Sequence, residues 1–412
     1  MPGPIKILLL TPQTPYPPDQ GAPIRNFSFV RYLGQDPRYE LTLLSFARPG
    51  EDAANSPALA ELSKYCHHVE LIPHPARRSK LSRLRDSLFS PLPDLAKRLA
   101  SPLYDAALVK ILKSQAFDVI QCEGLEMAPF VLAQAKSLNA RLVLDEHNAE
   151  FLLQRRIFEQ DWQSGWKRRP AALYSWLQAR RLTRYEREAL GQFDRSIAVS
   201  EPDRVALTAL GATHRPVAVI HNGIDLDEFS PDSNEQEQPD RLVFTGTMDF
   251  RPNVDAVSWF AGEVWPLVLA QKPAARFFIV GRRPAPAVTA LGNRPGIEVT
   301  GTVPDARPYV RQSTLYIVPM RMGGGVRFKV LEAMALGKAI VTTQMGADGI
   351  DLAAGKEAVV ADTAQDFAGA VVALLDDPAR RAALAQHGRR FVEVNFDWRK
   401  ITPQLDEVLT GQ

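Results

Sequence analysis

Short apolar runs alternate with amphipathic stretches along the whole chain. The runs of the first half are rich in Leu, Ile and Val and lie at residues 5–10, 41–46, 119–121, 142–144 and 197–199. Those of the second half lie at residues 242–244, 277–280, 297–299, 315–318 and 339–342. Short apolar strands that alternate with helices are typical of parallel sheets covered on both faces. The pattern predicts an α/β fold of two Rossmann-like, doubly wound, parallel-sheet domains.

A polar segment separates the two series of runs. Residues 230–240 contain no apolar side chain other than proline, as expected for a linker. A chain of 412 residues also exceeds the usual size of one domain. We therefore expect an N-terminal domain over residues 1–225, a linker over 226–240, a C-terminal domain over 241–390 and a C-terminal helix over 391–412.

Charge, cysteine content and the length of the apolar stretches exclude several classes of protein. The formal net charge of +2 provides no overall field that would attract nucleic acid, so no nucleic-acid partner is predicted. Two cysteines, Cys66 and Cys122, form neither a disulfide framework nor a metal-ligand spacing, which favours a reducing cytoplasm and no metal. No apolar stretch approaches the roughly 20 residues of a membrane-spanning helix. We expect a cytoplasmic protein that is soluble or peripheral to the membrane.

Two basic segments of the first half are candidates for contact with the inner membrane surface, at residues 77–85 and 154–187. The second holds nine Lys or Arg against three acids, together with Trp162, Trp166 and Trp176. Tryptophan beside cations is attracted to anionic bilayers. Solvated helix faces with core tryptophans explain the same residues, and periodicity does not separate the two interpretations.

The segment at residues 323–332 carries the strongest chemical signal. Its glycines can bring backbone N–H groups close to an anion at a helix start, where the dipole is positive. Two cations and a carboxylate follow, and a carboxylate can accept hydrogen bonds from both hydroxyls of a ribose. This arrangement predicts a clamp for a nucleoside diphosphate, formed by Gly323, Gly324, Gly325, Arg327, Lys329 and Glu332.

Other interpretations of this segment are weaker. It matches neither the Walker pattern nor the dinucleotide fingerprint. A glycine-rich turn before an ordinary helix, with Lys329 and Glu332 paired on its surface, is the alternative. Because the glycines follow an apolar strand at 315–318, they are expected at the carboxyl edge of the second sheet, where such folds bind ligands.

Motifs over nearly the whole chain resemble those of retaining glycosyltransferases of family 4, whose GT-B fold consists of two Rossmann-like domains that face each other across a cleft. The order and spacing of the motifs match together. In the first half they are Thr11-Pro12 through Gly21 and Arg25, Asp145 through Glu150, Val199-Ser200-Glu201, and Asn222 through Asp225 with Phe229. In the second half they are Gly246-Thr247-Met248, Pro252-Asn253, Val280-Gly281, Gly301 with Val303, and Gly323 through Ala335.

The resemblance implies roles for particular residues and a C-terminal helix that crosses back to the first domain. The residues implied in catalysis are His147, Arg327 and Lys329. Those implied in donor binding are Gly21, Gly246, Gly281, Arg282, Val303, Gly323, Gly324, Gly325, Val326 and Glu332. Those implied in the acceptor site or cleft are Arg25, Glu146, Asn148 and Glu201. Alternatives stay open, since Gly21 to Arg25 also reads as a proline-rich turn, Glu201 as a helix cap and His147 as a structural residue.

Two departures from the family pattern concern the donor site. The first glutamate of the usual Glu-x7-Glu motif is replaced by Gly324, with Glu332 as the second. Thr247 and Asn253 stand about where an arginine and a lysine are usual, and Arg327 and Lys329 are expected to replace those cations.

The resemblance implies a metal-independent glycosyltransferase without a cofactor. Its donor is expected to be a UDP- or GDP-sugar, and its acceptor a glycan or a lipid-linked sugar in cell-surface polysaccharide synthesis. A sugar-nucleotide 2-epimerase of the same fold and a noncatalytic partner subunit are the alternatives, the latter because Gly324 stands where a carboxylate is common.

Overall fold

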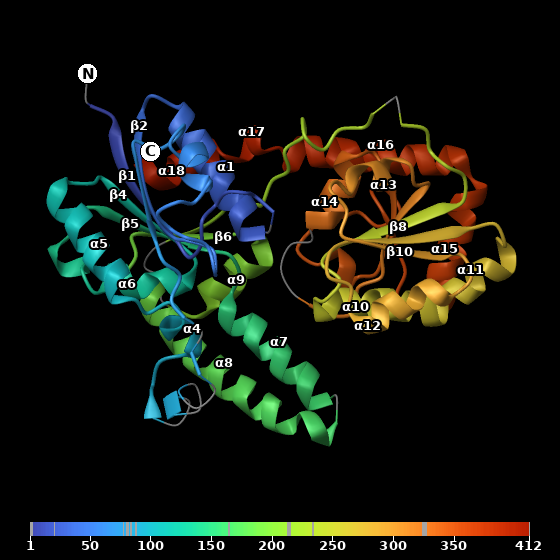
Figure 1. Cartoon of the computed structure of the whole chain (residues 1–412), viewed down its shortest axis with the longest axis horizontal. Helices are drawn as coiled ribbons and strands as arrows, with labels where there is room; N and C mark the ends of the chain where they lie inside the picture. Colours follow the sequence, from blue (N-terminus) through green and yellow to red (C-terminus); the bar gives the residue numbers. More distant parts are fainter. Residues whose placement is uncertain are drawn as a thin grey trace. The chain divides into compact units, whose positions relative to one another are not determined.

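A computed structural model of the chain describes all residues except 1, 2, 20, 77, 80, 81, 83, 84, 87, 88, 164, 212–215, 233, 234, 324–327 and 412, and it leaves out the side chains of Lys136 and Lys167. The chain forms two compact units. Unit 1 comprises residues 1–221 and 402–412, and unit 2 comprises residues 222–401 (Figure 1). Among the described residues, no helix combines the length and the apolar character required to cross a bilayer.

Unit 1 is built on a parallel sheet of seven strands in the order β3-β2-β1-β4-β5-β6-β7. The strands are β1 (Ile5–Thr11), β2 (Tyr39–Phe46), β3 (His68–Ile72), β4 (Val119–Glu123), β5 (Arg141–Glu146), β6 (Arg195–Ala198) and β7 (Val217–Val219). All five predicted strands are confirmed. The two missed strands lie at the sheet edges, and neither provides a long apolar run, because β3 includes His68 and Glu70 and β7 has only three residues.

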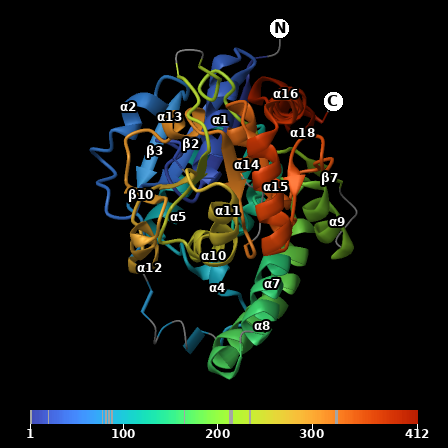
Figure 2. The same ribbon diagram turned by 90° about the vertical axis from the view of Figure 1, so that its right-hand side faces the viewer.

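The helices of unit 1 connect its strands and cover the sheet. They are α1 (Gly21–Gln35), α2 (Ala58–Leu62), α4 (Asp94–Lys97), α5 (Pro102–Ser114), η1 (Leu125–Met127), α6 (Ala128–Leu132), η2 (Ala135–Ser137), α7 (Glu150–Gln163), η3 (Trp166–Arg168), α8 (Arg169–Leu190), α9 (Glu201–Ala209) and α18 (Gln404–Thr410). Serine side chains cap two of them, because Ser101 accepts from Tyr104 N and Ser200 accepts from Asp203 N. Helices α7 and α8 pack against each other as a hairpin that extends beyond the sheet (Figures 1 and 2).

Unit 2 contains a parallel sheet of six strands in the order β10-β9-β8-β11-β12-β13. The strands are β8 (Arg241–Thr245), β9 (Arg276–Val280), β10 (Ile297–Gly301), β11 (Leu315–Val318), β12 (Ala339–Thr342) and β13 (Val359–Val360). The five predicted strands are again confirmed. The two-residue edge strand β13 is too short to show an apolar pattern.

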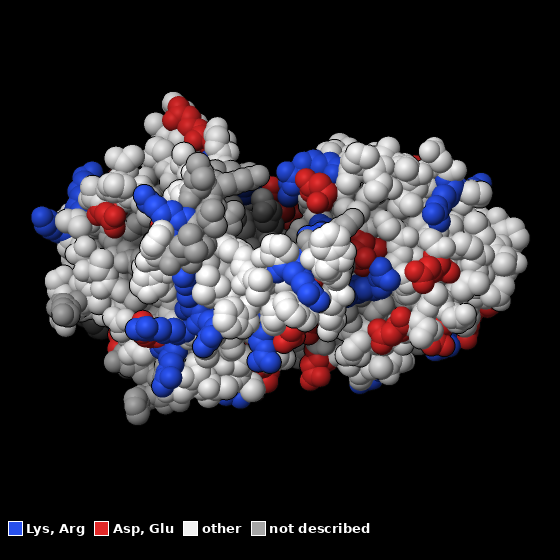
Figure 3. Space-filling model, turned by 90° about the horizontal axis from the view of Figure 1, so that it is seen from below, with Lys and Arg blue, Asp and Glu red and all other residues white. Residues whose placement is uncertain are grey.

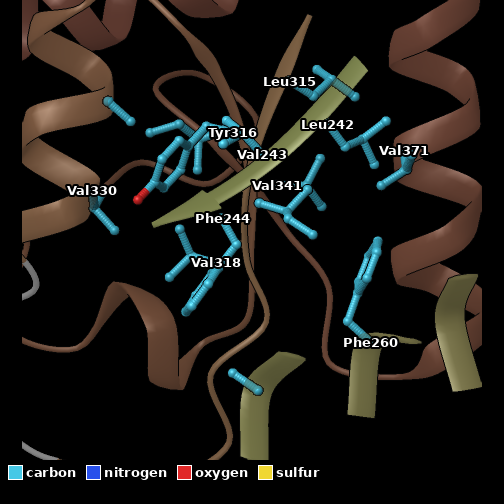
Figure 4. Close-up of a cluster of buried hydrophobic side chains, with 14 of the residues drawn as sticks. Leu242, Val243, Phe244, Phe260, Leu315, Tyr316, Val318, Val330, Val341 and Val371 are labelled. Atoms are coloured by element: carbon cyan, nitrogen blue, oxygen red, sulfur yellow. The ribbon is translucent and has the colours of Figure 1, made fainter. Parts of the chain in front are cut away.

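Helices cover both faces of this sheet and close its core. They are α10 (Arg251–Trp259), η4 (Phe260–Val264), α11 (Trp265–Gln271), α12 (Pro286–Thr289), η5 (Ala290–Asn293), α13 (Arg307–Arg311), α14 (Phe328–Ala335), η6 (Met345–Ala347), α15 (Ala364–Asp376), α16 (Pro378–Asn395) and α17 (Trp398–Ile401). Figure 4 shows the central strand β8 with buried side chains on both of its faces, toward Val330 of α14 and toward Val371 of α15. Burial of both faces accounts for the continuous apolar runs of the sequence.

The segment predicted as a linker belongs to unit 2, and the C-terminal segment is divided between the two units. Residues 226–240 lie in unit 2, where Glu237 pairs with Lys338 at 3.2 Å and Glu235 with Arg311 at 3.1 Å. Helix α16 and the following residues up to Ile401 also lie in unit 2. The chain then returns to unit 1, where Asp406 of α18 accepts from Tyr39 Oη at 2.7 Å.

Candidate functional site

Each sheet has a point at which its strand order reverses. In unit 1 this point lies between β1 and β4, and in unit 2 it lies between β8 and β11. Loops diverge there at the carboxyl ends of the strands, and doubly wound folds bind ligands at that place. We therefore expect the functional side chains of each unit at the carboxyl ends of these strands.

Lys329 lies at the reversal point of unit 2. From the first turn of α14, its Nζ donates to Thr245 O at 3.0 Å and to Asn253 Oδ1 at 2.8 Å. The ammonium also lies 4.0 Å from the centre of the Phe244 ring, which adds a cation–π contact. Because Thr245 ends β8, these contacts fix the ammonium at the carboxyl edge of the sheet. The carbonyl and amide oxygens are neutral, so they orient the charge without cancelling it.

Asn253 fixes the position of the lysine and is itself held in place. This buried residue of α10 donates from Nδ2 to Thr247 O at 2.9 Å, which leaves Oδ1 facing Lys329. Asn253 stands about where the family pattern has a lysine. Lys329 thus places its ammonium group beside Asn253, the position at which the family pattern has a lysine.

Gly246 and Gly281 pack their backbones together next to the same ammonium. A Cβ on Gly281 would lie 1.7 Å from Gly246 O, a distance that no side chain tolerates. A Cβ on Gly246 would lie 2.7 Å from Asn253 Nδ2 and 3.1 Å from Lys329 Nζ. Close packing of two loops at the sheet edge therefore explains both glycines. Arg282 joins the group through Nε, which lies 3.4 Å from Thr247 Oγ1.

Glu332 lies three residues after Lys329 on α14. Burial raises the pKa of its carboxyl group to about 7, an effect that Lys329 opposes and Glu228 reinforces. The side chain is therefore poised between its neutral and ionised forms near neutral pH. Val303 is half-buried against the core of unit 2, and Gly323 adopts a φ of 111° that favours glycine. Four predicted site residues lie outside the described part of the chain, namely Gly324, Gly325, Val326 and Arg327.

Arg25 and Asp145 form a buried ion pair at the reversal point of unit 1. Arg25 Nε donates to Asp145 Oδ2 at 2.6 Å and Nη2 donates to Oδ1 at 3.0 Å. Arg25 Nη1 donates to Ile220 O at 2.9 Å and to His221 O at 3.2 Å. The arginine is only 1% exposed, and the aspartate is fully buried. This bidentate pair ties α1 to β5 and favours a positioning role for Arg25 over direct contact with a ligand.

His147 follows β5 at the same edge and contacts a carboxylate that the sequence analysis missed. Its Nε2 lies 3.2 Å from Oε2 of Glu123, the fully buried last residue of β4. Burial lowers the pKa of His147, but the hydrogen bond to Glu123 and the charge of Asp145 outweigh it, so the pKa is raised. In the sequence, Glu123 is a charged residue at the end of a predicted strand, directly before Gly124. That position is the signal from which it could have been predicted as a site residue.

The three residues Glu123, Asp145 and His147 lie close enough to hold a metal ion, with one ligand atom from each within 4.8 Å of the others. Both Asp145 oxygens, however, accept hydrogen bonds from Arg25. A guanidinium in that place competes with a divalent cation for the same oxygens. The cluster therefore fits an ion-pair network better than a metal centre.

The sequence matches known families over both units. Residues 21–228, about half of the chain, match the family described as Glycosyltransferase Family 4. The chain belongs to this family. Residues 239–377 of this glycosyltransferase match the family described as Glycosyl transferases group 1.

Similar proteins agree with this assignment. The chain is 20% identical over 407 residues to an uncharacterized 44.6 kDa protein in the cps region of Klebsiella pneumoniae, which covers 96% of the chain and 97% of that protein. It is 27% identical over 241 residues to the lipopolysaccharide core biosynthesis mannosyltransferase LpcC of Rhizobium leguminosarum bv. viciae, covering 53% of the chain and 64% of that protein.

Solved structures show the fold. Anabaena Alr3699/HepE in complex with UDP superposes with a TM-score of 0.68 at 16% identity, over 99% of this chain and 100% of that one. The sucrose-phosphate synthase of Thermosynechococcus elongatus gives a TM-score of 0.68 at 17% identity, over 98% of both chains. Together with the two parallel sheets, these similarities confirm the predicted GT-B fold.

Glu146 of this glycosyltransferase lies on the opposite face of β5 from Asp145, because side chains alternate along a strand. It is fully buried, and neither of its carboxylate oxygens has a hydrogen-bond partner among the described residues. Burial and the nearby Glu186 and Glu150 raise its pKa well above the ordinary value. Glu146 is thus part of the layer between β5 and the hairpin. Asn148, also predicted at the site, opposes the raised pKa of the neighbouring Glu150.

The remaining predicted residues of unit 1 lie at helix starts. Gly21 is the exposed first residue of α1. Glu201 is exposed in the first turn of α9 and pairs with Arg204, whose Nε lies 2.8 Å from Glu201 Oε2. The side chain that caps this helix is Ser200, so Glu201 stays available to solvent rather than serving as the cap.

The α7–α8 hairpin of this glycosyltransferase exposes its tryptophans. Trp162 is 47% exposed, Trp166 is 74% exposed and Trp176 is 42% exposed, so they are not core residues. Figure 3 views the side toward which the hairpin points and shows separate groups of Lys and Arg among uncharged surface and groups of Asp and Glu. In the segment 77–85, Arg77, Lys80, Leu81, Arg83 and Leu84 lie outside the described residues. Arg78 pairs with Asp94 at 2.8 Å.

Proposed function

We propose that this glycosyltransferase is a retaining, metal-independent enzyme that transfers a sugar from a UDP- or GDP-sugar to a hydroxyl group of a glycan or lipid-linked acceptor. The observation that carries the proposal is the Lys329 ammonium, held by neutral oxygens at the carboxyl end of β8. A diphosphate that leaves the sugar gains negative charge, and a preorganised cation stabilises that charge. Arg327 adds a second cation in this proposal.

Names of similar proteins support the substrate classes. The structural neighbour HepE was crystallised with UDP and with UDP-glucose. LpcC is a mannosyltransferase of lipopolysaccharide core biosynthesis, and a Corynebacterium glutamicum relative, 26% identical over 236 residues, is a GDP-mannose-dependent mannosyltransferase that acts on a phosphatidylinositol mannoside. We infer a role in cell-surface polysaccharide synthesis on the cytoplasmic side of the inner membrane.

The proposed transfer is a front-face displacement. The acceptor oxygen forms a bond to the anomeric carbon on the side from which the diphosphate leaves, and the bond from that carbon to the diphosphate oxygen breaks. The hydroxyl proton passes to the leaving diphosphate, so atoms and charge balance. Lys329 stabilises the leaving group, and Glu332 accepts hydrogen bonds from the ribose hydroxyls. His147 donates a hydrogen bond to the donor.

A thermal-shift screen without added metal tests the donor site. UDP, GDP, ADP, dTDP and CDP are each added at saturating concentration, and a ligand at 100 times its dissociation constant stabilises by about 2.7 kcal/mol. We expect one of these diphosphates to raise the melting temperature of the wild type and of Lys356→Ala, but not of Lys329→Ala. Lys356 is a suitable control because its side chain is 64% exposed. No shift with any nucleotide would contradict the proposal.

Product analysis tests the stereochemistry. With the matching nucleotide sugar and a hydroxyl acceptor, proton NMR of the first product reports the anomeric configuration before it can equilibrate. Retention is expected. Inversion, or release of an epimerised sugar nucleotide without acceptor, would replace this reaction class with another.

We also propose that the α7–α8 hairpin contacts an anionic lipid surface. Its exposed tryptophans accompany exposed arginines, and two of them form cation–π pairs, Arg169 with Trp162 at 5.4 Å and Arg180 with Trp176 at 4.9 Å. Amphipathic aromatic rings beside cations complement the headgroup region of an anionic bilayer.

Vesicle flotation tests the lipid contact. We expect binding to phosphatidylglycerol vesicles that weakens in high salt, no binding to phosphatidylcholine vesicles, and loss of binding in Trp166→Ser. Phe250→Ser is the matched control, because Phe250 is 55% exposed in unit 2. Equal binding by Trp166→Ser, or self-association of the wild type without vesicle binding, would contradict the contact.

A further inference from the structure

His147 lies in a cluster that contains two buried carboxylates, those of Glu123 and Asp145. Glu123 ends β4, Asp145 lies near the end of β5, and Arg25 projects from α1, so three neighbouring elements supply its charges. Glu123, Asp145 and Arg25 are at most 1% exposed, whereas the His147 side chain is 18% exposed. The histidine is thus the member of this network that reaches solvent.

The contacts of Glu123 hold both of its oxygens in place. Oε1 accepts from Gln121 Nε2 at 2.6 Å, and Oε2 lies 3.2 Å from His147 Nε2. In the amide orientation that satisfies its neighbours, Asn26 donates to Glu123 Oε2 at 2.7 Å and to Ala22 O at 3.2 Å. A carboxylate fixed by two neutral donors can orient the imidazole ring that faces it.

The charges of Glu123, Asp145 and Arg25 balance when the histidine is a cation. Burial and the charge of Asp145 raise the pKa of Glu123, and the contact with His147 opposes that rise, so a cationic ring favours the ionised carboxylate. Two buried carboxylates, Glu123 and Asp145, face one guanidinium, that of Arg25, which leaves a negative charge uncompensated. A buried charge without a partner is costly. Proton transfer to the ring converts the contact of His147 with Glu123 into an ion pair. A further acid, Glu150 of α7, also interacts with His147.

We propose that Glu123 is a positioning residue, which holds His147 in the imidazolium form with Nε2–H directed at its carboxylate. The Nδ1–H group then remains as a cationic hydrogen-bond donor for a ligand, and the ring does not act as a proton acceptor. Burial lowers the pKa of His147, but the bond to Glu123 and the charge of Asp145 raise it further, so the net direction agrees with the geometry. The catalytic consequence rests on the proposed function, whereas the protonation state does not.

NMR of histidine-labelled protein without any substrate tests the inference. The chain has seven histidines, so the resonance that disappears in His147→Asn can be assigned. We expect the wild-type ring to titrate above the usual histidine value of about 6.5, with ¹⁵N shifts of an imidazolium below that midpoint. In Glu123→Gln the midpoint should fall by at least about one pH unit, as expected when an opposite charge in contact is removed.

A matched control is present in the same chain. Glu70 Oε2 lies 3.5 Å from His68 Nε2 in a partly exposed pair, and Glu70→Gln should leave the His147 titration unchanged. A wild-type His147 that titrates at or below about 6.5 would overturn the inference even if Glu123→Gln failed to fold. An unchanged midpoint in folded Glu123→Gln would also overturn it.

Kinetics then connect the charge to the reaction. If the imidazolium is the active form, Glu123→Gln shifts the alkaline limb of the kcat/KM profile to lower pH in parallel with the NMR midpoint. An NMR shift without a change in the pH profile would remove the catalytic role of the cation while leaving its positioning by Glu123 intact. If the wild type transfers no sugar at any pH, that result would instead count against the proposed function.

Discussion

The two reversal points of the protein hold their cations in opposite ways. In unit 1, Arg25 is bonded to both oxygens of Asp145, and His147 contacts Glu123. In unit 2, Lys329 is bonded to the neutral oxygens of Thr245 and Asn253. A guanidinium bonded to both oxygens of a buried carboxylate, as in Arg25, has little attraction left for a ligand, whereas an ammonium held by neutral oxygens keeps more of its field. The edge of unit 2 is therefore suited to an anion, whereas in unit 1 Arg25 belongs to a fixed scaffold and His147 has only its Nδ1–H group left for a ligand.

This contrast predicts that substitutions in the two units will differ in kind. Removing an ionic partner in unit 1 leaves a buried charge behind, so the main loss should be in stability. Removing Lys329 from unit 2 breaks hydrogen bonds to two neutral oxygens, and Glu332 nearby can take up a proton because burial raises its pKa to about 7, so the main loss should be in activity. Four experiments test this division.

Arg25→Ala should produce the largest effect, a loss of about 3–5 kcal/mol in the unfolding free energy of unit 1, because it leaves Asp145 buried and unpaired. Urea unfolding followed by tryptophan fluorescence, with the two units analysed as separate transitions, measures it. The double variant Arg25→Met with Asp145→Asn should recover part of the loss. Arg204→Ala is the control, since its pair with Glu201 is exposed. A stable Arg25→Ala protein would remove the contrast.

Lys329→Ala should lower turnover at least about 100-fold, corresponding to roughly 3–4 kcal/mol of transition-state stabilisation, without unfolding unit 2. The measurement is kcat with saturating donor, together with a melting curve. Lys356→Ala is again the control. A loss of tenfold or less would show that Lys329 does not stabilise the leaving group.

Asn253→Ala should reduce kcat/KM roughly 10- to 100-fold, because a hydrogen bond to a charged group contributes about 1.5–3 kcal/mol. The expected cause is a displaced Lys329, so the substitution should add little in a Lys329→Ala background. Additive losses in the double variant would mean that Asn253 acts independently of the lysine. Asn395→Ala, at the end of α16, is the control.

Nucleotide affinity should depend on pH through Glu332. Its pKa is raised to about 7, so the carboxyl group is mostly neutral at pH 6 and ionised at pH 8. If the ionised form accepts the ribose hydroxyls, the dissociation constant should be about tenfold larger at pH 6 than at pH 8. Glu332→Gln should remove this dependence, and its curve corrects for titration of the nucleotide itself. Parallel curves for both proteins would exclude the role of Glu332 in ribose binding.

The sequence predicted the sheets well and the two sites unequally. Long apolar runs identified ten strands, because strands buried on both faces have no polar positions. Lys329 was singled out as a candidate because it follows a run of three glycines in the sequence, which is a local pattern. The strands that were missed, β3, β7 and β13, are short or polar edge strands in which the local pattern is weak.

The scaffold of unit 1 could not be derived from local patterns. Glu123 and His147 are 24 residues apart, and only the pairing of β4 with β5 brings them together. Sequence reasoning also did not show which of Asp145 and Glu146 faces α1, so Arg25 was predicted as a ligand contact when it is buried against Asp145. Long-range pairing of buried charges leaves no signature at either position alone.

The return of the chain from unit 2 to unit 1 has a consequence during translation. Ile224 N donates to Phe396 O at 2.6 Å, so the first and last segments of unit 2 lie side by side, and unit 2 has all of its residues once Ile401 is made. Unit 1 still lacks α18 at that moment, and with it Asp406, the acceptor for Tyr39. Domains fold during synthesis as their residues emerge, so folding of the first unit cannot be finished until residues made after the whole second unit have followed it out of the ribosome. A ribosome halted just before residue 402 therefore has made every residue of the second unit, whereas the first still lacks its last helix.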